Sequence, residues 1–216
     1  MDLYNFLNLI WDQINKGIYV WGGDGEILSE MSDPIAWIER HETSAKDAKR
    51  AVTLFKKRVA AGVKEIRAFD CSGLVYWALH TLGLQKSDVS SRGLYALCTP
   101  IEKQDLRDGD LVFHHDGTRI VHVGVYVGNG QVIECKGRDD GVVLTKRNKL
   151  YWNRFGRWKA FEDLTTSTAP EPGQPVFSRN LKYGCAGADV VSLKKLLIAH
   201  GFKTGMDEAG NLLHMG

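Results

Sequence analysis

The change of character after residue 108 is the strongest constraint on how this chain folds. Beyond it, five short segments rich in β-branched and aromatic residues are separated by Gly, Asn and Asp turns: "GDLVFHH", "IVHVGVYVG", "QVIECKG", "GVVLTK" and "RWKAFED". Such runs predict the strands of an antiparallel meander. Before it, apolar residues recur mainly at helical spacing. Helices followed by strands indicate an α+β domain.

Three main helices are expected ahead of the strands. The first is amphipathic and carries the apolar stripe Leu3, Phe6, Leu7, Ile10, Trp11 and Ile14. The second covers residues 44–61, with apolar positions Ala45, Ala48, Val52, Phe55 and Val59. The third begins within "AFDCSGLVYWALH", with Asp70 as N-cap and Gly83 at its end. A short helix near "RGLYALC" is expected in the loop at 84–105.

The composition excludes several classes of function. Of the 216 residues, 44% are hydrophobic and 25% charged, as is typical of a soluble globular protein. The net charge of +2 is spread along the chain, so we expect no nucleic-acid partner. The N-terminal segment has no basic leader and no continuous apolar run, so we expect neither a signal peptide nor membrane insertion. We expect a monomer.

The cysteines do not indicate a metal site or a disulfide framework. The four of them, at positions 71, 98, 135 and 185, show neither CxxC pairing nor metal-ligand spacing. We therefore expect mostly free thiols. Because no metal, nucleotide or flavin motif occurs, no cofactor is expected.

Cys71 lies in the first turn of the third predicted helix, directly after Asp70. A thiol attacks as the thiolate, and the unpaired amides and dipole of a helix start favour that negative charge. The same position also suits an inert buried thiol, since cysteine often serves as a small apolar residue. Position alone supports the two interpretations about equally.

His122 is the best candidate for a base among the seven histidines. In "VHVGVYV" the valines alternate with His122, Gly124 and Tyr126, so the imidazole lies on the strand face opposite the valine row. Gly124, on the same face, leaves room for a substrate or a third side chain. Without that room, a lone strand histidine is more often a satisfied polar residue.

Glu134 is the nearest carboxylate on the next predicted strand and could orient the base. Whether it faces His122 depends on the hairpin register. A two-residue turn at 129–130 pairs Gly128 with Gln131 and turns Glu134 to the wrong side. In that case Glu134 is an ordinary solvated strand carboxylate.

The other possible turn gives the opposite result. A three-residue loop at 128–130, ending in a left-handed glycine, pairs Val127 with Gln131 and places Glu134 on the His122 face. A catalytic role for Glu134 therefore predicts this bulged turn.

With these residues in hand, the chain resembles the NlpC/P60 family of cysteine peptidases, which have a papain-like core and cut bacterial cell-wall peptides. The motifs occur in family order across residues 1–163: "YVWGG" (19–23), "FDCSGLV" (69–75), "LRDGDLVFH" (106–114) and "HVGVYVGNGQVIE" (122–134). The resemblance implies an α+β papain-like core, with N-terminal helices packed on an antiparallel sheet or partial barrel. It also implies Cys71 as nucleophile and His122 as base.

The resemblance also has two departures. Glu134 stands where the family commonly has histidine, and sometimes asparagine or glutamine. The segment from Gly23 to Cys71 is longer than in compact members, and it forms either a lid or wall of the cleft or mere decoration. The substrate-binding residues that the resemblance implies are Tyr19, Trp21, Asp70 and Ser72. In simpler terms, Tyr19 is a core aromatic, Asp70 a helix cap and Ser72 a first-turn residue.

The domains expected are a peptidase domain at 1–164, a linker at 165–178 and a tail at 179–216. The segment "TTSTAPEPGQPV" holds three of the five prolines and shows no periodicity, which is typical of a linker. The tail, with "LKYGCAGADVVSLKKLLIAHGF", resembles the beginning of a peptidoglycan-binding helical module. A tail of this size buries little core alone, so it is either a fragment or packs against the first domain. The resemblance implies an incomplete module.

The activity implied is hydrolysis of peptidoglycan stem peptides or muropeptides, at the bond between γ-linked D-Glu and the diamino acid. An N-acetylmuramoyl-L-alanine amidase, an acyltransferase of the same fold and an inactive wall-binding module are the alternatives. Action at the bacterial cell wall requires phage-type release or a secreted chain whose leader was removed. The third possibility is a cytoplasmic enzyme that recycles short muropeptides.

Overall fold

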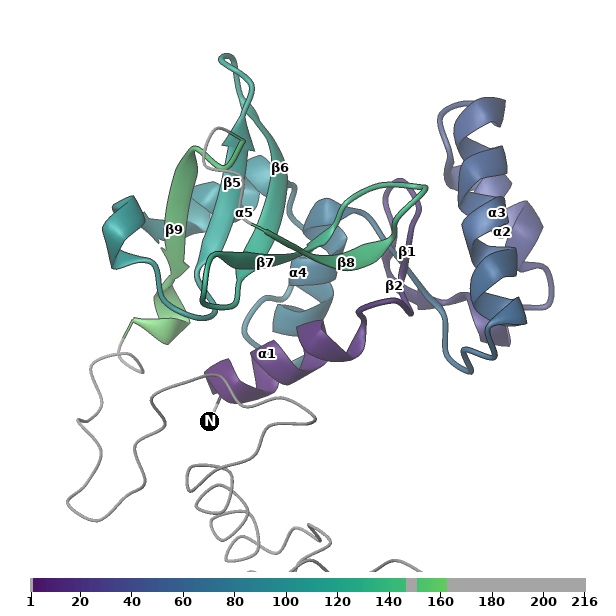
Figure 1. The fold of residues 1–216 in the computed structure, drawn as a ribbon, viewed down its shortest axis with the longest axis horizontal. Coiled ribbons are helices and arrows are strands. Elements are labelled where there is room, and N and C mark those ends of the chain that lie inside the picture. The colour runs from purple at the N-terminus through teal and green to yellow at the C-terminus, as the bar shows by residue number, and fades with distance from the viewer. Residues whose placement is uncertain (1, 147–150, 163–216) are drawn as a thin grey trace, which may run out of the picture. The chain divides into compact units, whose positions relative to one another are not determined.

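The computed structural model describes residues 2–146 and 151–162, which belong to a unit that ends at Thr165 (Figure 1). The predicted linker at 165–178 and the predicted module at 179–216 lie outside the described residues. Within the described ranges, most helices precede the main sheet, as the sequence predicts.

A six-stranded antiparallel sheet forms the larger part of the fold. Its strands lie in the order β4-β9-β5-β6-β7-β8, and their bounds are β4 (Cys98–Pro100), β5 (Leu111–His115), β6 (Ile120–Tyr126), β7 (Gln131–Cys135), β8 (Val142–Lys146) and β9 (Arg154–Trp158). Within the described residues the edge strands β4 and β8 do not pair, so the sheet is open.

Three helices share one hydrophobic core with this sheet. They are α1 (Asp2–Asp12), α4 (Cys71–Thr81) and α5 (Ser91–Leu97). Phe6 of α1, Leu74 of α4 and Leu94 of α5 are buried in the same cluster as Phe113 and Val123 of the sheet. Burial of such side chains is the main stabilising contribution to a fold. The arrangement confirms the predicted α+β class.

The predicted meander is confirmed for β5 to β8, but the last strand differs from the prediction. β9 returns to the other side of β5 and pairs with it. It covers Arg154–Trp158, whereas the sequence predicted a strand at 157–163, and Lys159–Phe161 forms a 3-10 helix instead. Trp158 and Phe161 are both buried although they lie three residues apart, which is the spacing of a helix and not of a strand.

A second sheet, which the sequence did not predict, brings Tyr19 to the start of α4. β1 (Ile18–Tyr19) pairs in parallel with β3 (Arg67–Phe69), and β2 (Asp24–Ile27) pairs with the other side of β3. Tyr19 lies opposite Phe69, shortly before Cys71. These strands have only two, three and four residues, too few to show an alternating pattern.

Two glycines allow the loop between β1 and β2 to pack closely on α4 and on β3. A Cβ added to Gly73 would lie 1.9 Å from the carbonyl oxygen of Gly23. A Cβ added to Gly23 would lie 2.9 Å from the backbone nitrogen of Phe69. Both positions therefore require a residue without a side chain.

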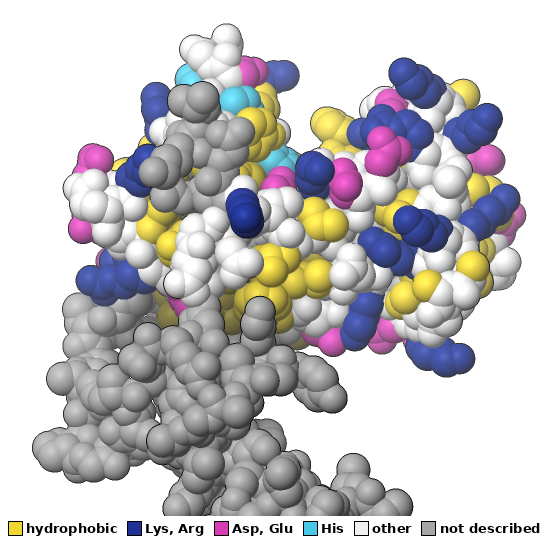
Figure 2. Space-filling view, in the orientation of Figure 1, with side chains coloured by type: hydrophobic (Ala, Val, Ile, Leu, Met, Phe, Trp, Pro, Cys, Tyr) yellow, Lys and Arg dark blue, Asp and Glu magenta, His cyan; other side chains and the backbone are white. Residues whose placement is uncertain are grey.

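The long segment between Gly23 and Cys71 contains a pair of helices with its own hydrophobic cluster. α3 (Ala45–Ala60) confirms the helix predicted at 44–61, whereas α2 (Pro34–His41) was not predicted, because two turns give little periodicity. Side chains of both helices are buried with those of β1 and β3: Ile18, Val20, Leu28, Ile38, Ala51, Leu54, Phe55, Ile66 and Ala68. Lysine and arginine side chains gather on the visible surface of this lobe, on the right in Figure 2.

Candidate active site

Cys71 is the first residue of α4, as predicted, and Asp70 caps the helix. Asp70 Oδ1 accepts hydrogen bonds from the amides of Ser72 (2.9 Å) and Gly73 (2.8 Å), and Oδ2 accepts one from the Gly22 amide (3.3 Å). Asp70 therefore holds both the helix start and the loop after β1. The buried Ser72 hydroxyl donates to Asp70 at 3.0 Å, so the structure places Ser72 in the cap.

His122 lies on β6, and its imidazole connects Cys71 with Glu134. Its Nε2 lies 2.8 Å from Glu134 Oε2, and Cys71 lies close enough to the ring to raise the pKa of the imidazole. Because the carboxylate occupies Nε2, Nδ1 is the nitrogen left for the thiol. The side chains of His122 and Glu134 belong to residues that are only 8% and 6% exposed, so water competes little with this bond.

The hairpin between β6 and β7 has the register that this contact requires. Tyr126 pairs with Val132, and continuing the pairing places Glu134 opposite Gly124, on the face of His122. The predicted register is therefore confirmed. It follows from backbone pairing and does not depend on a side-chain rotamer.

The turn reaches this register by combining features of both predicted turns. Asn129 (φ 50°) and Gly130 (φ 68°) are left-handed, as in the two-residue turn that alone would give the wrong register. Gly128 (φ 80°) is an additional bulged residue. The Val127 amide donates to the Gln131 carbonyl at 3.0 Å, and the Gln131 amide donates to the Gly128 carbonyl at 2.8 Å. The extra residue shifts the register by one, so the carboxylate faces the imidazole.

The room beside His122 that Gly124 was predicted to leave is filled by protein. Trp152 stacks on the imidazole, with 5.5 Å between ring centroids and 23° between ring planes. A Cβ added to Gly124 would lie 2.6 Å from Val132 Cγ1 and 3.2 Å from Trp152 Cη2. The glycine therefore admits packing partners for the base. Sequence reasoning missed Trp152 because it precedes β9 in a segment without periodicity.

Thr145 is a second residue of the site that the sequence reasoning missed. Its hydroxyl donates to Glu134 Oε1 at 2.6 Å, so both carboxylate oxygens are hydrogen-bonded. Val143 of β8 pairs with Glu134, and Thr145, two residues further on, shares its face. Strand alternation in "GVVLTK" was the signal that could have indicated it.

The pKa of His122 reflects opposing influences. Burial disfavours the imidazolium and lowers the pKa, but hydrogen bonds to Cys71 and Glu134 and the charges of both groups outweigh burial and raise it to about 9. The imidazole therefore holds a proton readily beside the thiol.

Tyr19 lies at the edge of this site and is covered by Arg138, from the turn between β7 and β8. The Arg138 guanidinium carbon lies 4.8 Å from the centroid of the Tyr19 ring. Burial, together with the charges of Cys71 and Asp70, raises the pKa of the Tyr19 phenol, and Arg138 opposes this shift. The phenol is thus a neutral hydrogen-bond donor near the thiol. No pattern in the sequence pointed to Arg138.

Trp21 is 54% exposed and lines a groove of about 450 Å³. The other lining residues are Ser90, Ser91, Arg92, Arg119, Ile120 and Val121. Val121 directly precedes His122 along β6. Of the predicted substrate-binding residues, Trp21 lines this groove.

Comparison with known proteins connects this site to one family. The model of the NlpC/P60 family matches residues 57–157, which include Cys71, His122 and Glu134. Murein DD-endopeptidase MepH of Escherichia coli (strain K12) is 40% identical over 90 residues, which are 40% of this chain and 33% of that protein. The probable endopeptidase p60 of Listeria grayi is 35% identical over 94 residues, which are 44% of this chain and 18% of that protein.

The chain thus spans a third or less of the length of these two relatives. Among solved structures, Rv1477, a hypothetical invasion protein of Mycobacterium tuberculosis, aligns with a TM-score of 0.51 at 20% identity, covering 73% of this chain and 62% of that one. At this identity the likeness shows a shared fold.

Residues 2–146 and 151–162 lack two further features. No three His, Cys, Asp or Glu side chains in these ranges gather as they would around a metal ion. None of the helices there combines the length and the apolar character needed to cross a membrane.

Proposed function

We propose that this chain, which contains an NlpC/P60 family domain, is a peptidoglycan endopeptidase that acts through Cys71, His122 and Glu134. The observation that carries the proposal is the 2.8 Å contact between His122 Nε2 and Glu134, with Cys71 close enough to raise the pKa of the same imidazole. Three groups from α4, β6 and β7 meet in the order in which a nucleophile, a base and an orienting group work.

The chemistry follows from these contacts. His122 Nδ1 takes the proton of the Cys71 thiol, and the thiolate attacks the carbonyl carbon of the scissile amide. Asp70 already occupies the amides of Ser72 and Gly73, so the Cys71 amide is the helix-start donor left for the developing oxyanion. The imidazolium then protonates the leaving amine, and water attacks the resulting thioester with His122 again as base.

The groove beside Trp21 supports a wall-peptide substrate. Arg92 and Arg119 supply two guanidinium groups, and Trp21 and Val121 supply apolar surface. Stem peptides present carboxylates along an extended chain, which such groups bind well. We place the substrate along this groove and the protein's action at the bacterial cell wall.

The bond that we propose is the one between γ-linked D-Glu and the diamino acid, as the family resemblance implies. The bond that a DD-endopeptidase cleaves is the second candidate, because the relative that is 40% identical is named a murein DD-endopeptidase. An N-acetylmuramoyl-L-alanine amidase or an acyltransferase would use the same Cys71–His122 pair.

Digestion of purified peptidoglycan, with the products identified by mass spectrometry, tests the proposal. Sacculi of the diaminopimelate type and of the lysine type are incubated with the wild-type chain and with Cys71→Ala. We expect products cut after D-Glu and no products from Cys71→Ala. Release of whole stem peptides from glycan would show an amidase, and cleavage by Cys71→Ala would refute the thiol mechanism.

An inactive wall-binding module is distinguished by the thiol itself. Alkylation of Cys71 by iodoacetamide at mildly acidic pH is fast when His122 stabilises the thiolate and slow for an ordinary thiol. Cys98 and Cys135 serve as internal controls, because both are buried and burial raises both thiol pKa values. Fast, selective alkylation of Cys71 favours the enzyme.

A further inference from the structure

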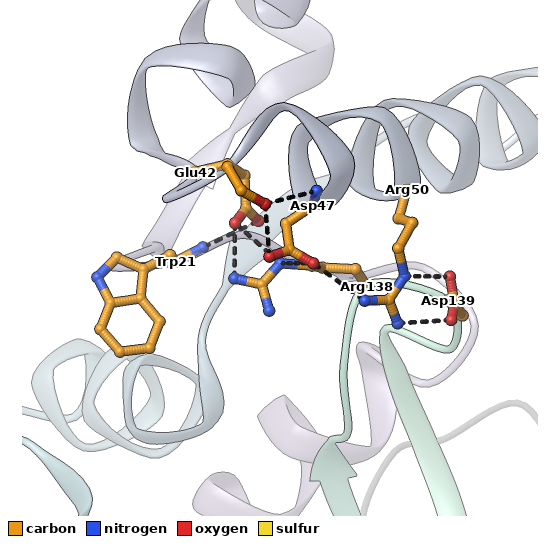
Figure 3. A network of polar contacts seen from close by, with 7 residues as sticks. Trp21, Glu42, Asp47, Arg50, Arg138 and Asp139 are labelled. Atoms are coloured by element: carbon orange, nitrogen blue, oxygen red, sulfur yellow. Dashed lines mark hydrogen bonds and ion pairs between the residues drawn. The ribbon is translucent and has the colours of Figure 1, made fainter.

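The long segment before Cys71 contacts the edge of the candidate site through one buried carboxylate, that of Glu42. Glu42 directly follows α2, and its side chain is 0% exposed. Its Oε2 accepts two hydrogen bonds from Arg138, from Nε at 2.8 Å and from Nη2 at 2.6 Å (Figure 3). Arg138 is the residue whose guanidinium covers Tyr19.

The other oxygen of the same carboxylate contacts the loop after β1. The Trp21 amide donates to Glu42 Oε1 at 3.4 Å, and the Gly22 amide donates to Asp70 Oδ2 at 3.3 Å. Two adjacent amides of this loop are therefore held by two carboxylates, one from the long segment and one from the cap beside Cys71. Trp21 is one of the two held residues, and Tyr19 lies two residues before it.

Stability alone is a poor explanation for the buried Glu42–Arg138 pair. Removing a carboxylate and a guanidinium from water is costly, and apolar residues of similar size commonly stabilise a fold at least as well. What the pair supplies is fixed geometry, because a guanidinium that bonds a carboxylate through two nitrogens has a defined orientation.

The charges around Arg138 argue against a direct role in binding a substrate anion. Asp47 Oδ1 lies 3.7 Å from Arg138 Nε, in addition to the contacts with Glu42. Arg50 pairs with Asp47 and Asp139 on the outer side (Figure 3). The charge of Arg138 is thus already compensated by two carboxylates, and its guanidinium lies over the Tyr19 ring.

We propose that Glu42 is a positioning residue for substrate binding: it holds Arg138 over Tyr19 and fixes the Trp21 amide, so that both aromatic side chains face the substrate. The inference rests on the proposed function. It also gives the long segment a role, which is to form the fixed outer wall of the substrate site.

Glu42→Gln tests the proposal, because glutamine keeps the shape but removes the charge that orients Arg138. We expect KM for muropeptide cleavage to rise about tenfold, the scale of losing a charge-assisted hydrogen bond. kcat and the iodoacetamide alkylation rate of Cys71 should change little. Arg138→Lys keeps the charge without the two-nitrogen geometry and should raise KM in the same direction.

Asp139→Asn is the matched control, since it removes a carboxylate from the exposed end of the same network. We expect its KM to equal that of the wild type. Melting temperatures identify variants that are merely unstable, and kinetics are measured well below them. An unchanged KM in both Glu42→Gln and Arg138→Lys would overturn the proposal, as would an equal rise in Asp139→Asn.

A binding measurement separates this proposal from the proposed function. The dissociation constant of a purified muropeptide is measured by calorimetry on Cys71→Ala, with and without Glu42→Gln. If the wild type cleaves nothing but Glu42→Gln weakens binding, the proposed function fails and the role of Glu42 stands. Equal affinity in the two variants would refute that role.

Discussion

Glu134 and Glu42 are two buried carboxylates, and each holds a nitrogen-containing side chain of the candidate site. They differ in how the fold brings each carboxylate to its partner. Glu134 lies 2.8 Å from His122, 12 residues away along the chain, within one hairpin. Glu42 lies 2.6 Å from Arg138, 96 residues away, across two lobes of the domain. The Glu134–His122 pair depends on the register of the hairpin between β6 and β7. The Glu42–Arg138 pair depends on the packing of the helices α2 and α3 against the rest of the domain. In the function that we propose, local geometry therefore positions the catalytic groups, and long-range packing forms the wall of the substrate site.

The largest effect that we expect is a fall in kcat on replacing Glu134, whereas replacing Glu42 should change KM. Glu134→Ala removes the group that orients His122 and should lower kcat about a hundredfold, within the usual range for general acid–base catalysis. KM should change little, in contrast to Glu42→Gln. Steady-state kinetics on a soluble muropeptide give both parameters. If Glu134→Ala altered KM alone, Glu134 and Glu42 could not be assigned different roles, one in orienting His122 and the other in substrate binding.

The pH dependence tests the charge state of His122. A histidine pKa raised by folding stabilises the folded protein fully below the unfolded value, about 6.5. That stabilisation is lost as pH rises through about 9, the value in the folded protein. We expect unfolding midpoints in urea and activity both to fall on the alkaline side near this pH. In Glu134→Gln the alkaline limb should move to lower pH; an unmoved limb would show that Glu134 does not act on the imidazole.

A smaller effect is expected from Thr145→Val, which leaves Glu134 in place but removes its second hydrogen bond. We expect a fall in kcat much smaller than that of Glu134→Ala, and a loss of about 1 kcal/mol in the free energy of unfolding. Urea denaturation and steady-state kinetics measure the two quantities. A fall in kcat as large as that of Glu134→Ala would make Thr145 an equal partner in orienting the base.

The smallest effect is expected at the outer end of the Glu42 network. Arg50 and Asp139 have side chains that are 39% and 65% exposed, so water and salt screen their attraction. Asp139→Asn should leave the melting temperature unchanged within error, whereas Glu42→Gln should lower it. Equal melting temperatures for the two variants would show that burial does not distinguish the two ends.

The sequence predicted the parts of the site that depend on local pattern. Asp70 as a cap and Cys71 in the first turn follow from helix-start chemistry, and His122 follows from strand alternation. Counting residues through the turn gave two possible positions for Glu134, and the one that a catalytic role required is the one observed. All of these are set by neighbours within about a dozen positions.

The parts that were missed depend on contacts between distant segments. Glu42 and Arg138 meet because α2 docks beside the turn after β7, and no pattern in either segment indicates the other. Trp152 reaches His122 because β9 crosses back to β5, a topology that strand signals alone do not specify. The short strands β1 and β3 pair through backbone groups, which every residue carries.

The bulge at Gly128 has a consequence for how this hairpin tolerates change. Deleting Gly128 would leave Asn129 and Gly130 as a plain two-residue turn with Val127 still opposite Gln131, so the contact between Glu134 and His122 would survive the loss. Replacing Gly128 with a β-branched residue keeps the chain length but disfavours the left-handed conformation observed there. The strand would then favour a one-residue slip that brings Cys135 to face His122 in place of Glu134. At this position, deletion should therefore disturb the site less than substitution by a β-branched residue. Within a folded domain the usual order is the reverse.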